Sequence, residues 1–451
     1  MRKDRLIVIG QGPDRGGELV QKNMQVQFAF GKDGLTLDLP EGPRWQIVGG
    51  RRCAPLPAIE EAIAAVLDRP IGCAPLTELA QGRKSAAICV CDITRPAPNR
   101  LTLPPLLERL HRAGIPPEGV TILIATGLHR PATSAELDTI LGAEIARRYR
   151  IANHDAHRRE EHRWLGYSAR KTPVWIDERL MAAELHLSLG FIEQHLMLGF
   201  SGGRKLVVPG VAGEETIRTI HSPRFMREPA AIEGSIEENP LHDELVSIAR
   251  MAGHDFILDV TMTREREISG VFAGSPVEAH AAGVAFLRAN SMQELDGFAD
   301  AVITSGAGYP LDLTFYQTIK GITAAQHLVK PGGPILLLAE CAEGMGSPEF
   351  ARKVRECRSH SGYLEEIAEG EVVPDQWQLE KLALAGLQHP LFFYTPGAIR
   401  EEMGFLGDSS YGDPREAVAA LVRSLPRDPT IALIPEGPYA FARVKPQPAF
   451  A

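Results

Sequence analysis

Short apolar runs that alternate with helical stretches constrain the fold of this chain most strongly. Residues 86–91, 120–125 and 185–189 each have the composition of a buried strand. Between and around them, residues 58–67, 106–113 and 136–148 carry apolar side chains at helical spacing. Strands that alternate with helices in this way are typical of α/β domains with a parallel sheet. We therefore expect an α/β fold.

A second round of the same pattern follows a helical stretch at residues 279–288. Strands are predicted at 301–305, 335–339 and 391–394, and helices at 351–357 and 375–387. A last strand at 430–434 is expected to return to the first domain. The prediction is two α/β domains with a hinged cleft between them. One comprises residues 1–287 with about 428–451, and the other residues 290–425.

An antiparallel element precedes the first α/β round. Residues 24–40 alternate apolar and polar side chains on either side of the turn Gly31-Lys-Asp-Gly34, as the two strands of a β-hairpin do.

Composition narrows the class of protein and of partner. The chain has 451 residues, which is enough for two or three domains, and its formal net charge of −9 disfavours nucleic acid or an anionic membrane as a partner. The six cysteines lie apart with no Cys-x-x-Cys pair, which favours a reducing cytoplasm over a disulfide-stabilised secreted protein. No stretch approaches the length of a membrane-spanning helix.

Polar side chains directly follow three of the predicted strands. They are Asp92, Thr94 and Arg95 after the first, His129 after the second, and Glu193 to His195 after the third. Ligands of α/β sheets bind beyond the carboxyl ends of the strands, so these groups predict one site. The alternatives are a salt-bridged turn at Asp92–Arg95 and a structural role for a strand-end histidine.

The segment from His195 to Lys205 places an imidazole and an amine beside a glycine-rich turn. A partly desolvated lysine is a nitrogen nucleophile suited to covalent attachment of a cofactor. The turn Ser201-Gly202-Gly203 lets backbone N–H groups approach an anion. We interpret the segment as a cofactor anchor.

Three further motifs are less specific. Gln317 and Lys320 share a predicted helix face and can present an amide and a cation to a hydroxy acid. The histidines of residues 153–162 can bind a metal, but their charged neighbours favour a solvated helix face. The glycine run at residues 10–16 misses the dinucleotide-binding spacing, which disfavours an ordinary nicotinamide dehydrogenase.

Taken together and in this order, the motifs resemble the nickel-dependent lactate racemase family. The resemblance covers most of the chain. It is carried by the hairpin at 28–32, Asp92-Ile-Thr-Arg-Pro96, Gly127-Leu-His-Arg-Pro131, Asn153-His-Asp155, Gly199-Phe-Ser-Gly-Gly-Arg-Lys205, His221, Tyr309-Pro-Leu-Asp312 and Tyr316-Gln317-x-x-Lys320.

The resemblance implies a cofactor and a set of residue roles. The cofactor is a nickel-pincer pyridinium mononucleotide attached covalently to Lys205, with His221 as the nickel ligand from the protein. His129 and His195 match the two acid/base histidines, one for each face of a small anionic α-hydroxy acid. Cofactor contacts are implied for Asp92, Thr94, Arg95 and the Ser201-Gly202-Gly203 turn. Substrate contacts are implied for Tyr316, Gln317, Lys320 and Trp377, and for Arg95.

The resemblance also implies that other proteins synthesise the cofactor, and it leaves the substrate open. The family often places aromatic residues just after the second histidine, where this chain has Leu196-Met-Leu198. Lactate, another α-hydroxy acid, or a sugar acid epimerised at its C2 therefore all remain candidates. A non-catalytic nickel or nucleotide carrier would need only Lys205 and His221, and the presence of both other histidines argues against it.

Overall fold

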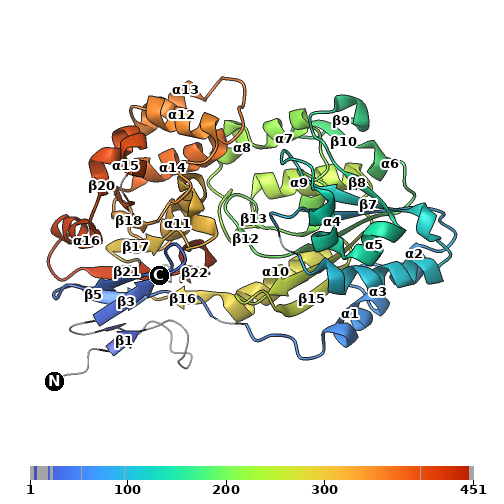
Figure 1. The fold of residues 1–451 in the computed structure, drawn as a ribbon, viewed down its shortest axis with the longest axis horizontal. Helices are drawn as coiled ribbons and strands as arrows, with labels where there is room; N and C mark the ends of the chain where they lie inside the picture. Colours follow the sequence, from blue (N-terminus) through green and yellow to red (C-terminus); the bar gives the residue numbers. More distant parts are fainter. Residues whose placement is uncertain are drawn as a thin grey trace, which may run out of the picture. The chain divides into compact units, whose positions relative to one another are not determined.

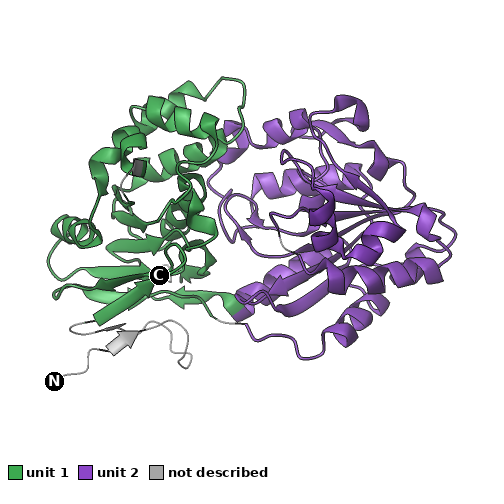
Figure 2. Ribbon diagram, in the orientation of Figure 1, with its two compact units in different colours: residues 1–51, 291–451 green, residues 52–290 purple. Residues whose placement is uncertain are grey.

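The computed structural model describes residues 24–51, 53–95, 97–396 and 398–445, together with strands β1 (Arg5–Ile7) and β2 (Leu19–Val20). The chain forms two compact units, shown separately coloured in Figure 2. Unit 1 combines Met1–Arg51 with Ser291–Ala451, and unit 2 is Arg52–Asn290. The glycine run at residues 10–16 lies outside the described residues.

Unit 2 is built on a six-stranded sheet of order β15-β14-β11-β6-β7-β8 (Figure 1). All neighbours are parallel except β14 and β15. The strands are β6 (Ala86–Cys91), β7 (Val120–Ala125), β8 (Arg150–Asn153), β11 (His186–Phe191), β14 (Phe256–Met262) and β15 (Ile268–Gly274). Two antiparallel pairs lie outside this sheet, β9 (His162–Tyr167) with β10 (Pro173–Asp177) and β12 (Gln194–His195) with β13 (Gly199–Phe200).

The helices of unit 2 cover the sheet through apolar faces. Leu103, Leu106 and Leu110 of α3 pack in one core with Ile88 and Ile122 of the sheet, and all five side chains are fully buried. The helices are α1 (Ile59–Asp68), α2 (Leu76–Leu79), α3 (Asn99–Arg112), α4 (Ser134–Leu141), α5 (Ala143–Arg148), α6 (Glu178–Met181), α7 (Glu214–Ile220), α8 (Pro223–Met226), α9 (Pro240–Met251) and α10 (Glu278–Ser291). The single helix expected at 136–148 is two, because Gly142 adopts a φ of +87° between α4 and α5.

The order of the strands places a topological switch point at β6. The chain runs from β6 to β7 and β8 on one side, and later adds β11 and β14 on the other. Crevices at such switch points, beyond the carboxyl ends of the strands, are where α/β sheets bind ligands. The segments after β6, β7 and β11 are therefore neighbours at this edge, as the sequence predicts.

Unit 1 contains a seven-stranded sheet of order β2-β5-β21-β17-β18-β19-β20, parallel except for β2 with β5. Its strands are β5 (Arg44–Ile47), β17 (Ala301–Ser305), β18 (Ile335–Leu338), β19 (Leu391–Tyr394), β20 (Ser410–Tyr411) and β21 (Thr430–Ile434). Smaller pairings join β3 (Met24–Phe28) to β4 (Leu35–Asp38) and β16 (Gln293–Leu295) to β22 (Ala442–Val444). The helices are α11 (Phe315–Ala325), α12 (Pro348–Glu356), α13 (His360–Glu366), α14 (Gln376–Gln388), α15 (Ala398–Glu402) and α16 (Pro414–Arg423).

The structure corrects the expected domain boundaries. The predicted hairpin is present as β3 and β4, and the boundary near residue 290 coincides with the prediction. Residues 24–51 and 428–445, however, belong with the second α/β round, because β5 and β21 pair directly beside β17 in its sheet. A buried hydrogen bond also joins the hairpin turn to the second α/β round, because Oδ2 of Asp312 accepts from the Gly31 N–H at 2.8 Å.

The α/β fold class is confirmed, with a parallel sheet in each unit. No helix within the described ranges has both the length and the apolar character needed to span a bilayer.

The strand pairings predict how fragments of the chain behave. Residues 52–290 contain every strand of the six-stranded sheet, so this fragment should unfold cooperatively on its own in urea. A chain ended at residue 427 lacks the interior strand β21, and its unit 1 should lose its cooperative transition while unit 2 keeps its own. Loss of both transitions in the shortened chain would contradict the division into units.

Candidate active site

A hydrogen-bonded pair joins the segments that follow β6 and β7. The Nδ1 atom of His129 lies 2.7 Å from Oδ2 of Asp92, and the hydroxyl of Thr94 donates to Oδ1 of the same carboxylate at 2.7 Å. The Asp92 side chain is 6% exposed, whereas that of His129 is 55% exposed. A buried carboxylate thus holds one nitrogen of a histidine whose ring reaches solvent.

The electrostatics of the pair favour an ionised Asp92. Burial acts to raise its pKa, but the hydrogen bonds from His129 and Thr94 and the positive charge of Arg95 bring the pKa below the usual value for aspartate. An ionised carboxylate is an acceptor only, so Nδ1 of His129 must donate. Nε2 is then the nitrogen that can accept a proton, as in a positioned general base.

His195 is carried by a short hairpin that begins just after β11. The hairpin pairs β12 with β13, and His195 lies opposite Gly199. Its tip is fixed from two sides, because the Arg204 guanidinium donates to the Leu198 carbonyl at 3.0 Å and the Asn239 amide donates to the Met197 carbonyl at 3.0 Å. The hairpin therefore gives the second histidine a defined position at the same edge of the sheet.

Lys205 follows a turn in which two successive glycines have left-handed backbone conformations. Gly202 has a φ of +78° and Gly203 a φ of +55°. A Cβ atom at Gly202 would lie 2.6 Å from Oδ2 of Asp259, the fully buried carboxylate that accepts a hydrogen bond from the Gly203 N–H at 2.6 Å. Glycine is needed here for both conformation and space.

The turn has fewer donors to offer an anion than its glycine content suggests. The Ser201 hydroxyl donates to the Phe191 carbonyl and accepts from the Glu193 N–H, each at 2.9 Å. The Ser201 N–H donates to the Glu193 carbonyl, and the Gly203 N–H is used by Asp259. These contacts brace the turn, and a contact of Ser201, Gly202 or Gly203 with a cofactor stays a prediction.

His221 directly follows α7 and is buried. Its Nδ1 atom lies 2.8 Å from the Ile217 carbonyl, so Nδ1 carries the proton and Nε2 is the basic nitrogen. Burial, assisted by the positive charge of Lys205, lowers the pKa of His221 to about 4. A neutral imidazole oriented by a backbone carbonyl is the usual state of a metal-binding histidine, so this residue fits its predicted role.

Cys91, the last residue of β6, lies close enough to several candidate residues for their charges to affect the pKa of its thiol. Burial raises its pKa to about 12, and the charges of Asp259, Arg95, Asp92 and Lys205 all act on it. The structure thus brings Asp92, Thr94, Arg95, His129 and Lys205 to one region of unit 2, and His221 joins them because its imidazole lies within electrostatic range of Lys205.

Apart from Arg95, the predicted substrate residues belong to unit 1 and lie on two helices that pack together, α11 and α14. Residues 345–347 contact both starts, since the Tyr316 N–H donates to the Met345 carbonyl at 3.0 Å and Ser347 donates to Asp375 beside Trp377 at 2.6 Å. The side-chain oxygen of Gln317 is buried without a hydrogen-bond partner among the described residues. That oxygen could accept a hydrogen bond from a ligand, whereas Lys320 lies one turn further along α11.

The histidine-rich stretch is wrongly predicted as a solvated helix face. Residues 150–153 and 162–167 are strands β8 and β9, and the side chains of His154 and His162 are buried. Within the described part of the chain there is also no group of three or more metal-binding side chains.

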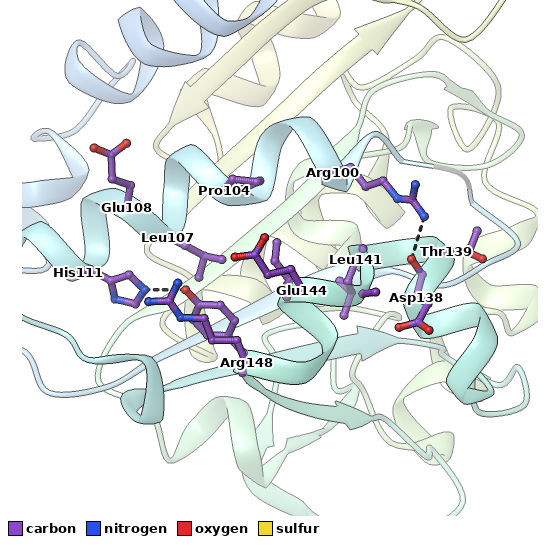
Figure 3. A pocket seen from close by; sticks show the side chains of 14 residues that line it. Arg100, Pro104, Leu107, Glu108, His111, Asp138, Thr139, Leu141, Glu144 and Arg148 are labelled. Atoms are coloured by element: carbon purple, nitrogen blue, oxygen red, sulfur yellow. Dashed lines mark hydrogen bonds between the residues drawn. The ribbon is translucent and has the colours of Figure 1, made fainter.

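A separate pocket of about 700 Å³ lies between α3, α4 and α5 in unit 2 (Figure 3). Leu107, Leu141 and Ile145 line it together with side chains of both charges, and His111 lies 2.7 Å from the Tyr149 hydroxyl within it. None of the predicted site residues lines this pocket. The pocket is therefore not the site described above.

Comparison with known proteins identifies the family. The lactate racemase N-terminal domain matches residues 30–234, and the lactate racemase C-terminal domain matches residues 296–438. A lactate racemase of Thermoanaerobacterium thermosaccharolyticum is 32% identical over 425 residues, which cover 93% of this chain and 99% of the relative. A lactate racemase of Lactiplantibacillus plantarum is 35% identical over 340 residues, covering 74% of this chain and 80% of the relative.

Solved structures agree with these matches. The lactate racemase apoprotein of Thermoanaerobacterium thermosaccharolyticum superposes with a TM-score of 0.85 at 32% identity, covering 94% of this chain and all of the relative. A Thermotoga maritima protein shares the fold, with a TM-score of 0.62 at 17% identity over 87% of this chain and all of the other. With both family domains matched and two relatives above 30% identity over most of their length, this chain belongs to the lactate racemase family, a family of isomerases.

Proposed function

We propose that this protein racemises lactate or a closely related α-hydroxy acid, with His129 and His195 as the acid/base groups for opposite faces of the substrate. The observation that carries the proposal is the Asp92–His129 pair, because it leaves the outer nitrogen of an exposed ring available for proton transfer. His195 is held on its own hairpin after a neighbouring strand. Two positioned bases suit a reaction that inverts a centre through a planar intermediate.

The residues of this chain also fit the proposed nickel-pincer mononucleotide. Lys205 would carry it covalently and His221 would bind nickel through Nε2, and Arg95 is a cation suited to its phosphate or to the substrate carboxylate. When bound, the cofactor would reversibly take up the hydrogen on the substrate's C2. The solved relative is described as an apoprotein, the term for a protein without its cofactor.

Within this proposal, the chain's own residues move the hydroxyl proton. Nε2 of His129, or the ring of His195, would take that proton as the hydroxyl carbon becomes a planar carbonyl, and the opposite histidine would return one when the other enantiomer forms. Asp92 stabilises the positive charge that His129 gains, because its carboxylate stays ionised. Tyr316, Gln317, Lys320 and Trp377 are proposed to contact the substrate, and proteins that synthesise the cofactor are the proposed partners.

The proposed compartment is the cytoplasm. It is supported by the absence of any disulfide among the cysteines of the described residues.

Replacement of either histidine tests the acid/base roles. His129→Ala and His195→Ala should each lower the rate of lactate racemisation by about 10²- to 10⁴-fold, since positioned acid/base catalysis contributes that much. Chiral chromatography of the product measures the rate. Nickel content and the mass of the cofactor adduct should remain those of the wild type, and a variant that keeps its full rate would rule out that histidine as a base.

Asp92→Asn tests the pair itself. An amide can present its N–H₂ to Nδ1 and so favour the wrong tautomer of His129, an effect that costs about 10⁴-fold in a serine protease. We expect a loss of at least 10²-fold in kcat with the cofactor still attached. Thr94→Val is the matched control, because it removes only one hydrogen bond to the carboxylate and should cost about tenfold or less.

The pH dependence of the wild type follows from the same pair. Because the pKa of Asp92 is lowered, the ionised carboxylate persists as pH falls until the folded-state pKa is reached. The contribution of the pair to stability should therefore be lost only below the usual pKa of aspartate. In Asp92→Asn this acid limb should be absent from the pH profile of thermal unfolding.

Lys205→Ala tests covalent attachment. Protein co-expressed with cofactor-making enzymes should show an adduct by intact-mass spectrometry in the wild type and none in the variant. Arg204→Lys is no suitable control, because Arg204 braces the hairpin, but the exposed Arg170→Ala should keep the full adduct. An undiminished adduct in Lys205→Ala would overturn the assignment of Lys205 as the attachment site.

The choice of substrate needs a separate assay. Activity of the wild type on a panel of chiral hydroxy acids would distinguish lactate from sugar acids.

A further inference from the structure

His154 lies just after β8 with its side chain fully buried, and both ring nitrogens face acceptors. Nδ1 lies 3.1 Å from Oδ2 of Asp177, and Nε2 lies 3.0 Å from the Ala212 carbonyl. A carbonyl cannot donate, and neither can an ionised carboxylate. The ring therefore donates from both nitrogens, as an imidazolium paired with Asp177.

Asp177 is suited to this pairing because it stays ionised. Burial acts to raise its pKa, but hydrogen bonds from Arg179 and His154 bring the pKa far below the usual value. Arg179 also contacts Glu161, so the buried charges form a connected network with a path to the surface. Breaking such a network by removing one partner leaves a buried charge uncompensated.

The three groups that His154 contacts belong to three different segments of unit 2, two of which lead to candidate site residues. Its own carbonyl accepts from the Thr126 hydroxyl at 2.7 Å, and the Thr126 carbonyl accepts from the N–H of His129 at 2.9 Å. Ala212 lies between Lys205 and α7, which is followed by His221. The same stretch is tied to β10, because the Asp177 N–H donates to the Val211 carbonyl at 2.9 Å.

We infer that His154 is a positioning residue that fixes the segment between Lys205 and His221 relative to the loop that carries His129. The effect on catalysis rests on the proposed function, whereas the link between the two segments rests only on the hydrogen bonds of His154. A misplacement of about 1 Å in an active site can cost about 10²-fold in rate. A doubly donating ring satisfies both acceptors, the Asp177 carboxylate and the Ala212 carbonyl.

The test compares His154→Gln with His186→Gln. His186 is the matched control, because it is also buried with both nitrogens facing carbonyls, those of Ala252 at 2.7 Å and Ala183 at 2.9 Å. It begins β11 at the opposite end of the strand from the His195 hairpin. Hydrogen exchange of the cofactor-free proteins, followed by mass spectrometry, should show about tenfold faster exchange in residues 206–221 for His154→Gln only.

The loaded enzymes give a second measurement. In His154→Gln, kcat should fall by about 10- to 100-fold with a smaller change in KM, and His186→Gln should keep its rate. Equal exchange of residues 206–221 in the two variants would overturn the inference. Faster exchange without any effect on racemisation would leave the geometric link intact but refute its importance for catalysis, whereas a loaded wild type that does not racemise would count against the proposed function.

Thr126→Val covers the case in which His154→Gln does not fold. It keeps the shape of the side chain and removes only the hydroxyl that binds the His154 carbonyl. Residues 126–129 should then exchange faster, and kcat should fall by about tenfold with nickel content and adduct mass unchanged. A wild-type exchange pattern together with a wild-type kcat would refute the positioning role.

Discussion

Parallel pairing of β6 with β7 on one side and β11 on the other is the constraint on which the site depends. It puts the residues after three strands at one edge of one sheet, although they are distant in the sequence. The strands themselves are buried on both faces, so the register of β6 is specified by packing as well as by hydrogen bonds. A change that shifted β6 would move Asp92 away from His129.

Much of the fold could be predicted because seven strands of the two sheets are short apolar runs with a helix nearby: β6, β7, β11, β17, β18, β19 and β21. The wrong domain assignment concerns strands whose pairing partners are distant in the sequence. Residues 430–434 were correctly predicted as a strand, but their partners β5 and β17 are chosen by long-range hydrogen bonds that no local pattern encodes. The break at Gly142 is a smaller case, since an isolated glycine within a helical pattern is often tolerated.

In the candidate site, too, individual residues could be predicted from the sequence, but contacts between distant residues could not. Strand ends identified Asp92 and His129 separately, but their hydrogen bond joins residues 37 positions apart and could not be read from spacing. His154 was missed because its charged neighbours suggested a solvated surface, whereas the ring is buried against Asp177. One sequence signal could have indicated its burial. His154 stands between two polar residues, Asn153 and Asp155, at the end of a strand, and side chains of successive strand residues point to opposite faces.

The surroundings of Lys205 illustrate how buried charge can serve position rather than stability. Burial lowers the pKa of Arg204 to about 9 and raises that of Asp259 to about 6, so both are mainly charged at neutral pH. Neither forms an ion pair among the residues that the structure describes; they bind backbone groups of the hairpin and of the glycine turn instead. Burying a charge costs several kcal/mol per ion even after the protein has relaxed around it. A turn fixed in this way is ordered in advance, which would lower the entropy lost on the attachment proposed at Lys205.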